Sequence, residues 1–450
     1  MIRLLILSAV LLGSVSTSKG ADVQSASAEP VVEESLEVSP VWSGHPVGFC
    51  LLTHGDRQYV GFYDHQRRMT VAARKLNERD WQLIHLPQTL GWDSHNYIAM
   101  AIDRAGHLHL AGNMHGVPLV YFRTDQPHDI HSFKQIQQMV GREESRVTYP
   151  KFMRGPKGEL IFTYRDGGSG AGNQILNVYD PDRRAWRRLL DVPLIDGQGE
   201  MNAYLDTWRR DRQGTYHLCW VWRDTPDCAT NHDVCYARTR DLVHWERSDG
   251  TPLKLPITYK TGEIVDPVPA GGGLLNGNVR LGFDDRDRPV ISYHKYDEQG
   301  YTQAYNARLE EGRWTIRKVS DWEYRWEFSG GGSISYEIAV GSVQADGKGR
   351  LVQAFRHPRA GSRRWLLDPK TLTPVETLPG VRRTPRALDK VESGVPGMQV
   401  RWAEDSGASD QAGIRYLLRW ETLGPHRDRP REGEPPPPAT LRVLKISANE

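Results

Sequence analysis

The chain has 450 residues, of which 38% are hydrophobic and 25% are charged, so it is long enough to bury a large globular core. Lys and Arg number 58 against 56 Asp and Glu, and the first twenty residues hold the excess, Arg3 and Lys19. This balance argues against a general binder of nucleic acid or of anionic membranes, because such proteins are usually basic. The composition, with 43 Gly and 14 Trp, favours a protein of strands and turns.

The N-terminal residues predict a targeting segment. Arg3 precedes an apolar run from Leu4 to Leu12, and small and polar residues follow up to Ala21. This pattern predicts a signal peptide over residues 1–20, and therefore a secreted or periplasmic protein. An uncleaved anchor is the alternative, although the run is short for a membrane span. We expect no membrane span elsewhere, and we expect a monomer.

Two further segments at the ends of the chain have biased compositions. Residues 21–40 are rich in Ser, Glu, Val and Ala and are predicted to form a flexible lead-in. Residues 426–450 include four consecutive prolines and are predicted to form a solvated Pro-rich tail.

One turn signature recurs along the chain: an acidic or small polar residue, a turn that usually contains Gly, and then alternating apolar residues. A second series of apolar residues, mostly aromatic, follows polar turns in step with the first. Repeats of four short strands at such a period predict a seven-bladed β-propeller over residues 41–425. Tandem sandwiches would require linkers, and the sequence has none inside this span. The turns begin at Thr53, Asp103, Gly155, Asp211, Asp285, Asp346 and Asp410, and the second series is Trp81, Phe133, Trp186, Trp245, Trp314 and Leu372.

Hairpin geometry places polar side chains on one face of the propeller. Residues equidistant from a turn lie opposite each other in an antiparallel pair. His95 therefore falls opposite Met114, next to His115. The same reflection places the polar residues of the other repeats at the hairpin ends that lie away from the recurring turns. The predicted face carries His95, Asn96, Asn113, His115, Tyr164, Arg165, Tyr204, Arg223, His294, Lys295 and Arg356.

Four motifs carry a family resemblance. They are Asp93-Ser94-His95-Asn96-Tyr97-Ile98, Gly112-Asn113-Met114-His115, Thr148-Tyr149-Pro150-Lys151-Phe152 and Tyr164-Arg165-Asp166-Gly167-Gly168-Ser169-Gly170. These motifs resemble the BNR-4 repeat proteins, a group that includes the propeller-type ulvan lyases. The resemblance extends from about Pro40 to about Asp297 and implies a polysaccharide lyase.

A uronate lyase breaks a glycosidic bond by β-elimination. The reaction needs a donor or cation on the C6 carboxylate, a base near the C5 proton and an acid for the O4 leaving group. By resemblance, His95 and His115 match the histidine pair of the ulvan lyases, and Tyr164 matches the family tyrosine that supplies the acid. The sequence does not decide which residue is the base. Arg165, Arg209 or Arg223 is expected to neutralise the carboxylate.

Each of these residues also has a structural alternative. Either histidine can bond a backbone carbonyl at the end of a blade, and Tyr164 can be a half-buried core residue. Arg165 can pair with Asp166 across the Gly-rich turn.

Four cysteines, Cys50, Cys219, Cys228 and Cys235, leave three alternatives open. An exported protein can oxidise thiols, and a disulfide from Cys219 or Cys228 to Cys235 is one alternative. By resemblance to the ulvan lyases, a structural zinc ion is the second, with His217, His232, Cys235 and His294 as ligands. Free thiols are the third, and no organic cofactor is expected.

The sequence therefore predicts a secreted propeller that cleaves an ulvan-like acidic polysaccharide by elimination. One alternative is a sialidase-like glycoside hydrolase, but its three arginines, Tyr/Glu pair and Asp acid cannot be assembled from this chain. A non-catalytic glycan-binding propeller is the other alternative.

Overall fold

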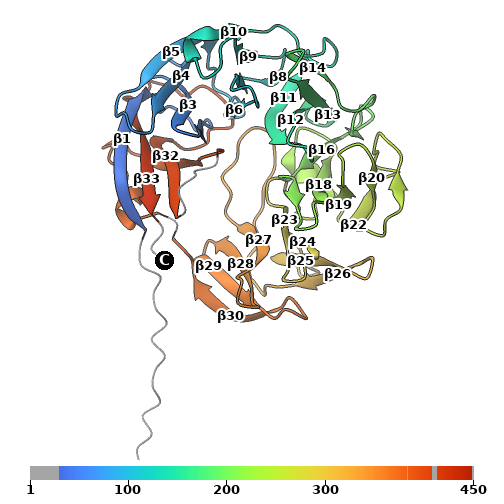
Figure 1. The fold of residues 1–450 in the computed structure, drawn as a ribbon. Helices are drawn as coiled ribbons and strands as arrows, with labels where there is room; N and C mark the ends of the chain where they lie inside the picture. Colours follow the sequence, from blue (N-terminus) through green and yellow to red (C-terminus); the bar gives the residue numbers. More distant parts are fainter. Residues whose placement is uncertain (1–29, 383, 408–412, 448–450) are drawn as a thin grey trace, which may run out of the picture.

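The computed structural model describes residues 30–382, 384–407 and 413–447, which form β-sheets arranged in a ring (Figure 1). Within these ranges the strands form seven sheets, each named below by its inner or first strand. The expected all-β propeller fold is confirmed. The predicted signal peptide and the start of the seventh predicted turn, at Asp410, lie outside the described residues. No helix in the described ranges is long and apolar enough to cross a membrane.

The first three sheets occupy the N-terminal part of the described chain. The β2 sheet contains β2 (Cys50–His54), β3 (Arg57–Tyr63), β4 (Arg68–Lys75) and β5 (Gln82–Thr89). The β6 sheet contains β6 (Ile98–Ile102), β7 (Leu108–Gly112), β9 (Tyr121–Thr124) and β10 (Phe133–Gln135), with a 3-10 helix at Ile130–Ser132. The β11 sheet contains β8 (His115–Val117), β11 (Val147–Arg154), β12 (Leu160–Gly168), β13 (Ala171–Asp180), β14 (Ala185–Arg188) and β15 (Ile195–Asp196).

The next three sheets continue around the ring (Figure 1). The β16 sheet contains β16 (Asn202–Leu205), β17 (Arg209–Arg210), β18 (Tyr216–Arg223), β19 (Asn231–Thr239), β20 (Trp245–Glu246), β21 (Pro252–Leu253) and β22 (Glu263–Asp266), with a 3-10 helix at Cys228–Thr230. The β23 sheet contains β23 (Arg280–Phe283), β24 (Pro289–Tyr296), β25 (Thr302–Glu310) and β26 (Arg313–Lys318). The β27 sheet contains β27 (Ala339–Ala345), β28 (Leu351–His357), β29 (Gly361–Leu367) and β30 (Pro374–Pro379), and a 3-10 helix at Arg386–Asp389 follows it.

The last sheet joins the two ends of the described chain. β31 (Met398–Glu404), β32 (Ile414–Leu423) and β33 (Ala439–Ser447) continue into β1 (Val31–Val41), which pairs with β33 along its length. The lead-in and tail predictions are therefore wrong where β1 and β33 form. Leu36 and Val38 of β1 alternate with polar residues and are 4% and 8% exposed, an amphipathic strand pattern within a segment of mostly polar composition.

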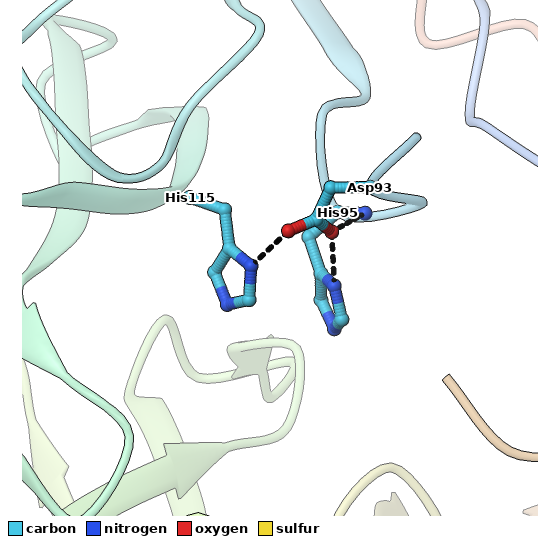
Figure 2. Close-up of side chains that lie close together, drawn as sticks. All are labelled: Asp93, His95 and His115. Carbon is cyan, nitrogen blue, oxygen red and sulfur yellow. Dashed lines mark hydrogen bonds and ion pairs between the residues drawn. The ribbon is translucent and has the colours of Figure 1, made fainter. Parts of the chain in front are cut away.

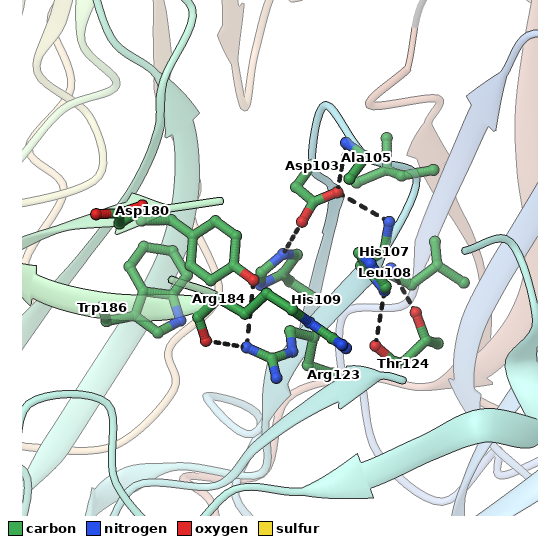
Figure 3. A network of polar contacts seen from close by, with 12 residues as sticks. Asp103, Ala105, His107, Leu108, His109, Arg123, Thr124, Asp180, Arg184 and Trp186 are labelled. Carbon is green, nitrogen blue, oxygen red and sulfur yellow. Dashed lines mark hydrogen bonds and ion pairs between the residues drawn. The ribbon is translucent and has the colours of Figure 1, made fainter. Parts of the chain in front are cut away.

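The recurring Asp of the turn signature closes the turn with its side chain. Asp103 Oδ1 accepts hydrogen bonds from the backbone N–H groups of Ala105 and His107, both at 2.9 Å (Figure 3). Gly106 then adopts a φ of 88°, which a residue with a side chain rarely does. Asp284 makes the same two bonds in the β23 sheet, at 3.0 and 2.9 Å. The signature is thus a device that fixes one end of a hairpin.

Aromatic residues of the second series fill the space between the outer strands. Trp186 and Trp245 are 7% and 2% exposed, and the Trp186 indole donates to Tyr121 Oη at 3.0 Å. The first and last sheets meet through Phe49 and Trp420, whose rings stack with centroids 4.7 Å apart. These contacts join neighbouring sheets of the ring.

Candidate functional site

His95 and His115 lie together, as predicted, at the end of the β6–β7 hairpin that is away from the Asp103 turn. We call this end of each hairpin the mouth end, and the end with the Asp turn the turn end. Ile98 pairs with Gly112 in this hairpin, so the next residues outward bring the two histidines opposite each other. Their rings stack with centroids 4.2 Å apart and planes 24° apart. His115 also begins β8, where it pairs with Thr148 of β11 and so joins two sheets.

Asp93 binds both imidazoles. Nδ1 of His95 donates to Asp93 Oδ1 at 2.7 Å, and Nδ1 of His115 donates to Oδ2 at 2.5 Å. Figure 2 shows that both rings turn Nδ1 toward the carboxylate and Nε2 away from it, to the same side. One carboxylate therefore sets the orientation of two rings, and Nε2 of neither ring has a hydrogen-bond partner among the described residues, so both can meet a ligand.

A second carboxylate reaches His95 from the distant C-terminal segment. Asp428 Oδ2 lies 3.4 Å from His95 Nδ1. Its Oδ1 accepts from the backbone N and Oγ of Ser94 at 3.0 and 2.6 Å, and its Oδ2 accepts from the backbone N of Ser333 at 2.7 Å. Asp428 lies in the predicted tail, and no local motif marks it, since more than 330 residues separate it from its histidine partner. That contact follows from the return of the chain to β33.

These contacts determine the charge of His95. Burial lowers its pKa, but the hydrogen bonds to Asp428 and Asp93 outweigh burial and raise the pKa to about 9. Burial alone would raise the pKa of Asp93, whereas its bonds to His115 and His95 hold the pKa well below its usual range. His95 is therefore an imidazolium at neutral pH, beside two carboxylates.

Tyr149 lies next to the histidine pair because β11 contains a bulge. The pairing of β11 with β12 shifts register between Thr148 and Lys151, and Tyr149 has a φ of 57°, unusual for a bulky residue. Its ring centroid lies 5.8 Å from that of His95 and 6.3 Å from that of His115. Burial raises the pKa of the Tyr149 hydroxyl, so it carries its proton at neutral pH.

Tyr164, the predicted acid, is a core residue, so that prediction is wrong. Its side chain is 0% exposed, its hydroxyl donates to the backbone O of Glu143 at 2.9 Å, and it accepts from Arg188 Nη1 at 2.9 Å. In a regular hairpin Tyr149 and Tyr164 would lie opposite each other on one face. The bulge separates them, and only Tyr149 reaches the histidines.

Two buried arginines form the other half of the site around Tyr204. The Tyr204 hydroxyl lies 2.7 Å from Ser169 Oγ and accepts from Nη1 of Arg165 and of Arg223, at 3.4 and 3.3 Å. Arg165 also lies over the Tyr149 ring, with Cζ 5.0 Å from its centroid. Burial raises the pKa of Tyr204, but the charges of Arg223 and Arg165 outweigh it and lower the pKa.

The two arginines have no carboxylate partner. Arg165 and Arg223 are 3% and 7% exposed, and the described residues give neither an ion pair. Arg165 Nε has no hydrogen-bond partner in the described structure. Buried guanidinium groups are normally paired, so this half of the site is suited to an anion.

The predicted amides also lie at the site. Asn96 and Asn113 line a pocket of ≈ 550 Å³ together with Asp93 and His115. Asn113 Nδ2 donates to Gln88 Oε1 and to the backbone O of Thr89, both at 3.1 Å. Asn113 thus fixes the wall of this pocket.

Three other predicted binding residues do not join the cluster. Arg209 lies in β17, is exposed and pairs with His217 of β18. This places it at the turn end of β18, whereas Arg223 lies at the opposite end of that strand. Lys295 donates to Asp266 Oδ2 at 2.6 Å. His294 is 0% exposed and packs against Trp326, with centroids 5.4 Å apart. The predicted substrate contacts of Arg209 and His294 are wrong, because one lies at the turn end and the other is fully buried. The contact of Lys295, whose side chain is partly exposed, stays a prediction.

The predicted zinc ligands do not converge, so no metal site fits them. His217 donates to Asp211 at 3.1 Å and accepts from Tyr236 at 2.6 Å, as His109 does with Asp103 and Tyr121 two sheets earlier. His232, near the other end of the β18–β19 pair, contacts Asp224 and Asp233. His217 and His232 each have carboxylate partners, and His217 repeats a structural arrangement of the blades. Neither ring nitrogen of the buried His294 has a hydrogen-bond partner in the described structure.

The structure also decides between the alternatives for the cysteines. Cys235 is 0% exposed, and all four cysteines are free thiols, so the disulfide alternative is wrong. Among the described residues, the ligand atoms of Asp93, His95 and His115 do lie within 4.8 Å of one another. In this group Asp93 already holds both histidines through their Nδ1 atoms.

Comparison with known proteins places these observations in a family. The polysaccharide lyase Uly1 has a structure with a TM-score of 0.61 at 12% identity, covering 93% of this chain and 100% of its own. An ulvan lyase of family PL25, also solved bound to -[GlcA(1-4)Rha3S]-, gives a TM-score of 0.58 at 13% identity, covering 91% of this chain and 95% of its own. At such identities the likeness shows the fold alone.

Among curated proteins, none matches the sequence. The sequence does match the BNR repeat-containing family over residues 57–322, which is more than half of the chain and includes every motif that suggested the resemblance. The chain therefore belongs to the BNR repeat-containing family.

Proposed function

We propose that this protein is a polysaccharide lyase that cleaves a uronate-containing acidic polysaccharide by β-elimination. The observation that carries the proposal is the division of the site into two halves. A histidine pair held by Asp93 lies on one side of Tyr149, and two buried arginines without carboxylate partners lie on the other.

The charges of the two halves orient the substrate. Arg165 and Arg223 are cations that suit the C6 carboxylate of a uronate, whereas Asp93 and Asp428 make the histidine half unsuitable for a second anion. With its carboxylate at the arginines, the sugar places its C5 and O4 atoms toward Tyr149 and the histidines.

Each step then has a residue suited to it. His115 Nε2 takes the C5 proton, since Nδ1 is held by Asp93. The electron pair of the C5–H bond forms the C4–C5 double bond, and the C4–O4 bond breaks. The departing O4 takes a proton from the Tyr149 hydroxyl, whose raised pKa keeps it protonated until then. The His95 imidazolium positions His115 by stacking against it.

Finer features of the proposal follow the similar proteins. The neighbour bound to -[GlcA(1-4)Rha3S]- supports ulvan, a polymer with both carboxylate and sulfate, as the first substrate to test. We further propose that each of the seven sheets is one blade and that the protein acts as a secreted or periplasmic monomer. A location outside the cytoplasm suits a polymeric substrate of this kind.

The product of the reaction tests the proposal. Elimination leaves a double bond conjugated to the carboxylate, which absorbs in the ultraviolet, whereas hydrolysis does not. Purified protein should raise the absorbance of a solution of ulvan or another uronate polysaccharide. His115→Ala should abolish the rise, and His131→Ala, which removes an exposed histidine elsewhere, should not.

Other outcomes would redirect the interpretation. New reducing ends without ultraviolet absorbance would support the sialidase-like hydrolase. Binding of polymer without any product would support a glycan-binding propeller. Either result would overturn the proposed lyase.

A further inference from the structure

The β27 sheet bears a second cationic surface, away from the histidine cluster. A groove of ≈ 620 Å³ lies on it, lined by residues of β23, β27, β28 and β29 and by Asn278, Gly380 and Val381. None of the described residues that line it is acidic. We call it the arginine groove, after its lining residues Arg280, Arg356, Arg363 and Arg364.

Strand alternation explains how this groove forms. Gln353 of β28 faces the β23 sheet, where it exchanges hydrogen bonds with Asn306 at 2.8 and 3.0 Å. The alternate residues Val352, Ala354 and Arg356 turn to the other face of β28 and line the groove. Phe355 also lines it but is only 6% exposed. The groove floor is therefore small and apolar, with guanidinium groups beside it.

Three of the arginines lack carboxylate partners. Arg356 Nη2 donates to the backbone O of Tyr336 at 2.6 Å, Arg364 Nε to that of Pro379 at 3.1 Å, and Arg363 Nη1 to that of Ser362 at 3.1 Å. None of the three has an ion pair with a described residue, whereas Arg280 is paired with Asp206 at 3.1 Å.

Their placement favours a bound anion. Arg356 pairs with Ser362, and Ala354 pairs with Arg364, so the two arginines are diagonal neighbours on one face, at backbone positions about 7 Å apart. Both residues carry a positive charge on the same face of the sheet, and each guanidinium has N–H groups besides the one that donates to a backbone carbonyl. A sulfate or carboxylate bound on this face accepts charged hydrogen bonds from them.

One loop connects the groove to the histidine cluster. Arg356 binds the backbone O of Tyr336, and Ser333, three residues earlier, donates to Asp428, which contacts His95. Three residues span at most about 10 Å, so the groove begins close to the cluster. A polymer of several sugars can reach both.

We propose that the arginine groove is a distal subsite for the acidic polysaccharide whose uronate occupies the histidine cluster, and that it binds a sulfate or carboxylate further along the chain. The inference rests on the proposed function for the class of polymer. A polysaccharide is favoured over nucleic acid because the lining aromatic, Phe355, is buried against Trp365 and offers no face for a base to stack on.

The test compares two double variants that remove the same charge. Arg356→Gln/Arg364→Gln alters the groove, and Arg313→Gln/Arg317→Gln alters two exposed arginines on the outer strand β26. With ulvan as substrate, the groove variant should raise KM about tenfold with kcat unchanged, as expected for the loss of charged hydrogen bonds in binding. With a short ulvan oligosaccharide, the groove variant should have the kinetics of the wild type. The β26 variant should have the kinetics of the wild type with either substrate.

A binding assay separates this inference from the proposed activity. Electrophoresis through gels that contain dextran sulfate or polyglucuronate should retard the wild type and the β26 variant, and should retard the groove variant less. If the wild type shows no lyase activity and the groove variant still loses retardation, the groove is supported and the proposed function is overturned. Equal retardation of all three proteins would overturn the groove and leave the lyase standing.

Competitors identify the anion. If inorganic sulfate displaces the polymer when both supply the same concentration of sulfate groups, the groove is a site for free anions and the polymer subsite is overturned. Equal, arginine-dependent retardation by DNA would overturn the commitment to a polysaccharide. If the double variant fails to fold, Arg364→Glu alone should weaken binding at least as much, since it also adds a repelling charge.

Discussion

Two histidine–carboxylate groups at opposite ends of one hairpin have opposite charge states. His109, near the Asp turn, is 0% exposed and bonds Asp103 at 3.5 Å, and burial outweighs that bond and lowers its pKa to about 4 (Figure 3). His95, at the mouth, meets two carboxylates, and its pKa rises to about 9. One neighbouring carboxylate is therefore not enough to keep a histidine protonated at neutral pH. The access of water to the ring and the number of carboxylates around it determine its protonation state.

Other residues show the same contrast between the two ends. His217, near the Asp211 turn, is buried and bonds both Asp211 and Tyr236. Tyr149 and Arg223, at the mouth, lie in a cluster whose arginines lack carboxylates. The turn end holds the fold together, and the mouth end keeps its groups available for a ligand.

The largest expected effect separates the two tyrosines. Tyr149→Phe removes the proposed acid and should lower kcat about 1000-fold with little change in KM. Tyr164→Phe removes two buried hydrogen bonds and should lower the free energy of unfolding by about 1–2 kcal/mol, with kcat retained. Rates from ultraviolet absorbance and urea unfolding measure the two effects. A large loss of kcat in Tyr164→Phe alone would reverse the assignment.

The next effect concerns stability in acid. The unfolded chain protonates His109 near pH 6.5 and the folded chain only near pH 4, so unfolding takes up a proton between these values. The His109 contribution is complete above pH 6.5 and is lost as the pH falls toward 4, by about 3 kcal/mol. His109→Gln should therefore show a shallower loss of stability than the wild type between pH 7 and 4.5. Parallel urea unfolding curves would contradict the burial argument.

A smaller effect distinguishes two arginines of the same sheet. Arg223→Gln removes a charge from the Tyr204 half and should lower kcat/KM on a uronate polymer roughly 10- to 100-fold. It should also raise the pKa of Tyr204, seen in the ultraviolet titration of tyrosine. Arg209→Gln, at the turn end, should leave both quantities unchanged. Equal losses in both variants would indicate a general effect of charge.

The smallest effect tests the C-terminal carboxylate. Asp428→Asn leaves His95 with Asp93 alone and should lower the pKa of His95 by about one unit, measured by NMR titration of the imidazole. In the wild type the stability from His95 is complete below pH 6.5 and is lost as pH rises through 9; in the variant the loss begins at lower pH. Asp182→Asn, an exposed change, is the control. An unchanged titration would rule out the Asp428 contact.

Local patterns in the sequence predict much of the fold. The Asp turns and the alternating strands indicate an all-β propeller, and reflection about the turns gives the observed pairs of Asn202 with Arg223 and of Ala339 with Arg356. β1 and β33 escape such an analysis, because their partners lie at the far end of the chain.

The same limits apply to the site. Reflection brings His95 to His115, but the bulge at Tyr149 breaks the regular pairing and exchanges one tyrosine for another. The signal available in the sequence is Pro150, which cannot donate a ladder hydrogen bond and favours an irregularity there. Asp428 offers no such signal, since its contact depends on long-range closure.

The pairing of β1 with β33 has a consequence for the order of events in the cell. A ribosome makes Val31–Val41 before Ala439–Ser447, so the last sheet cannot be completed until Ser447 has been made. Until then the apolar face of β1 has no partner strand, and the nascent chain remains an open arc. The closing pair of strands therefore forms only after every other sheet of the ring has been synthesised.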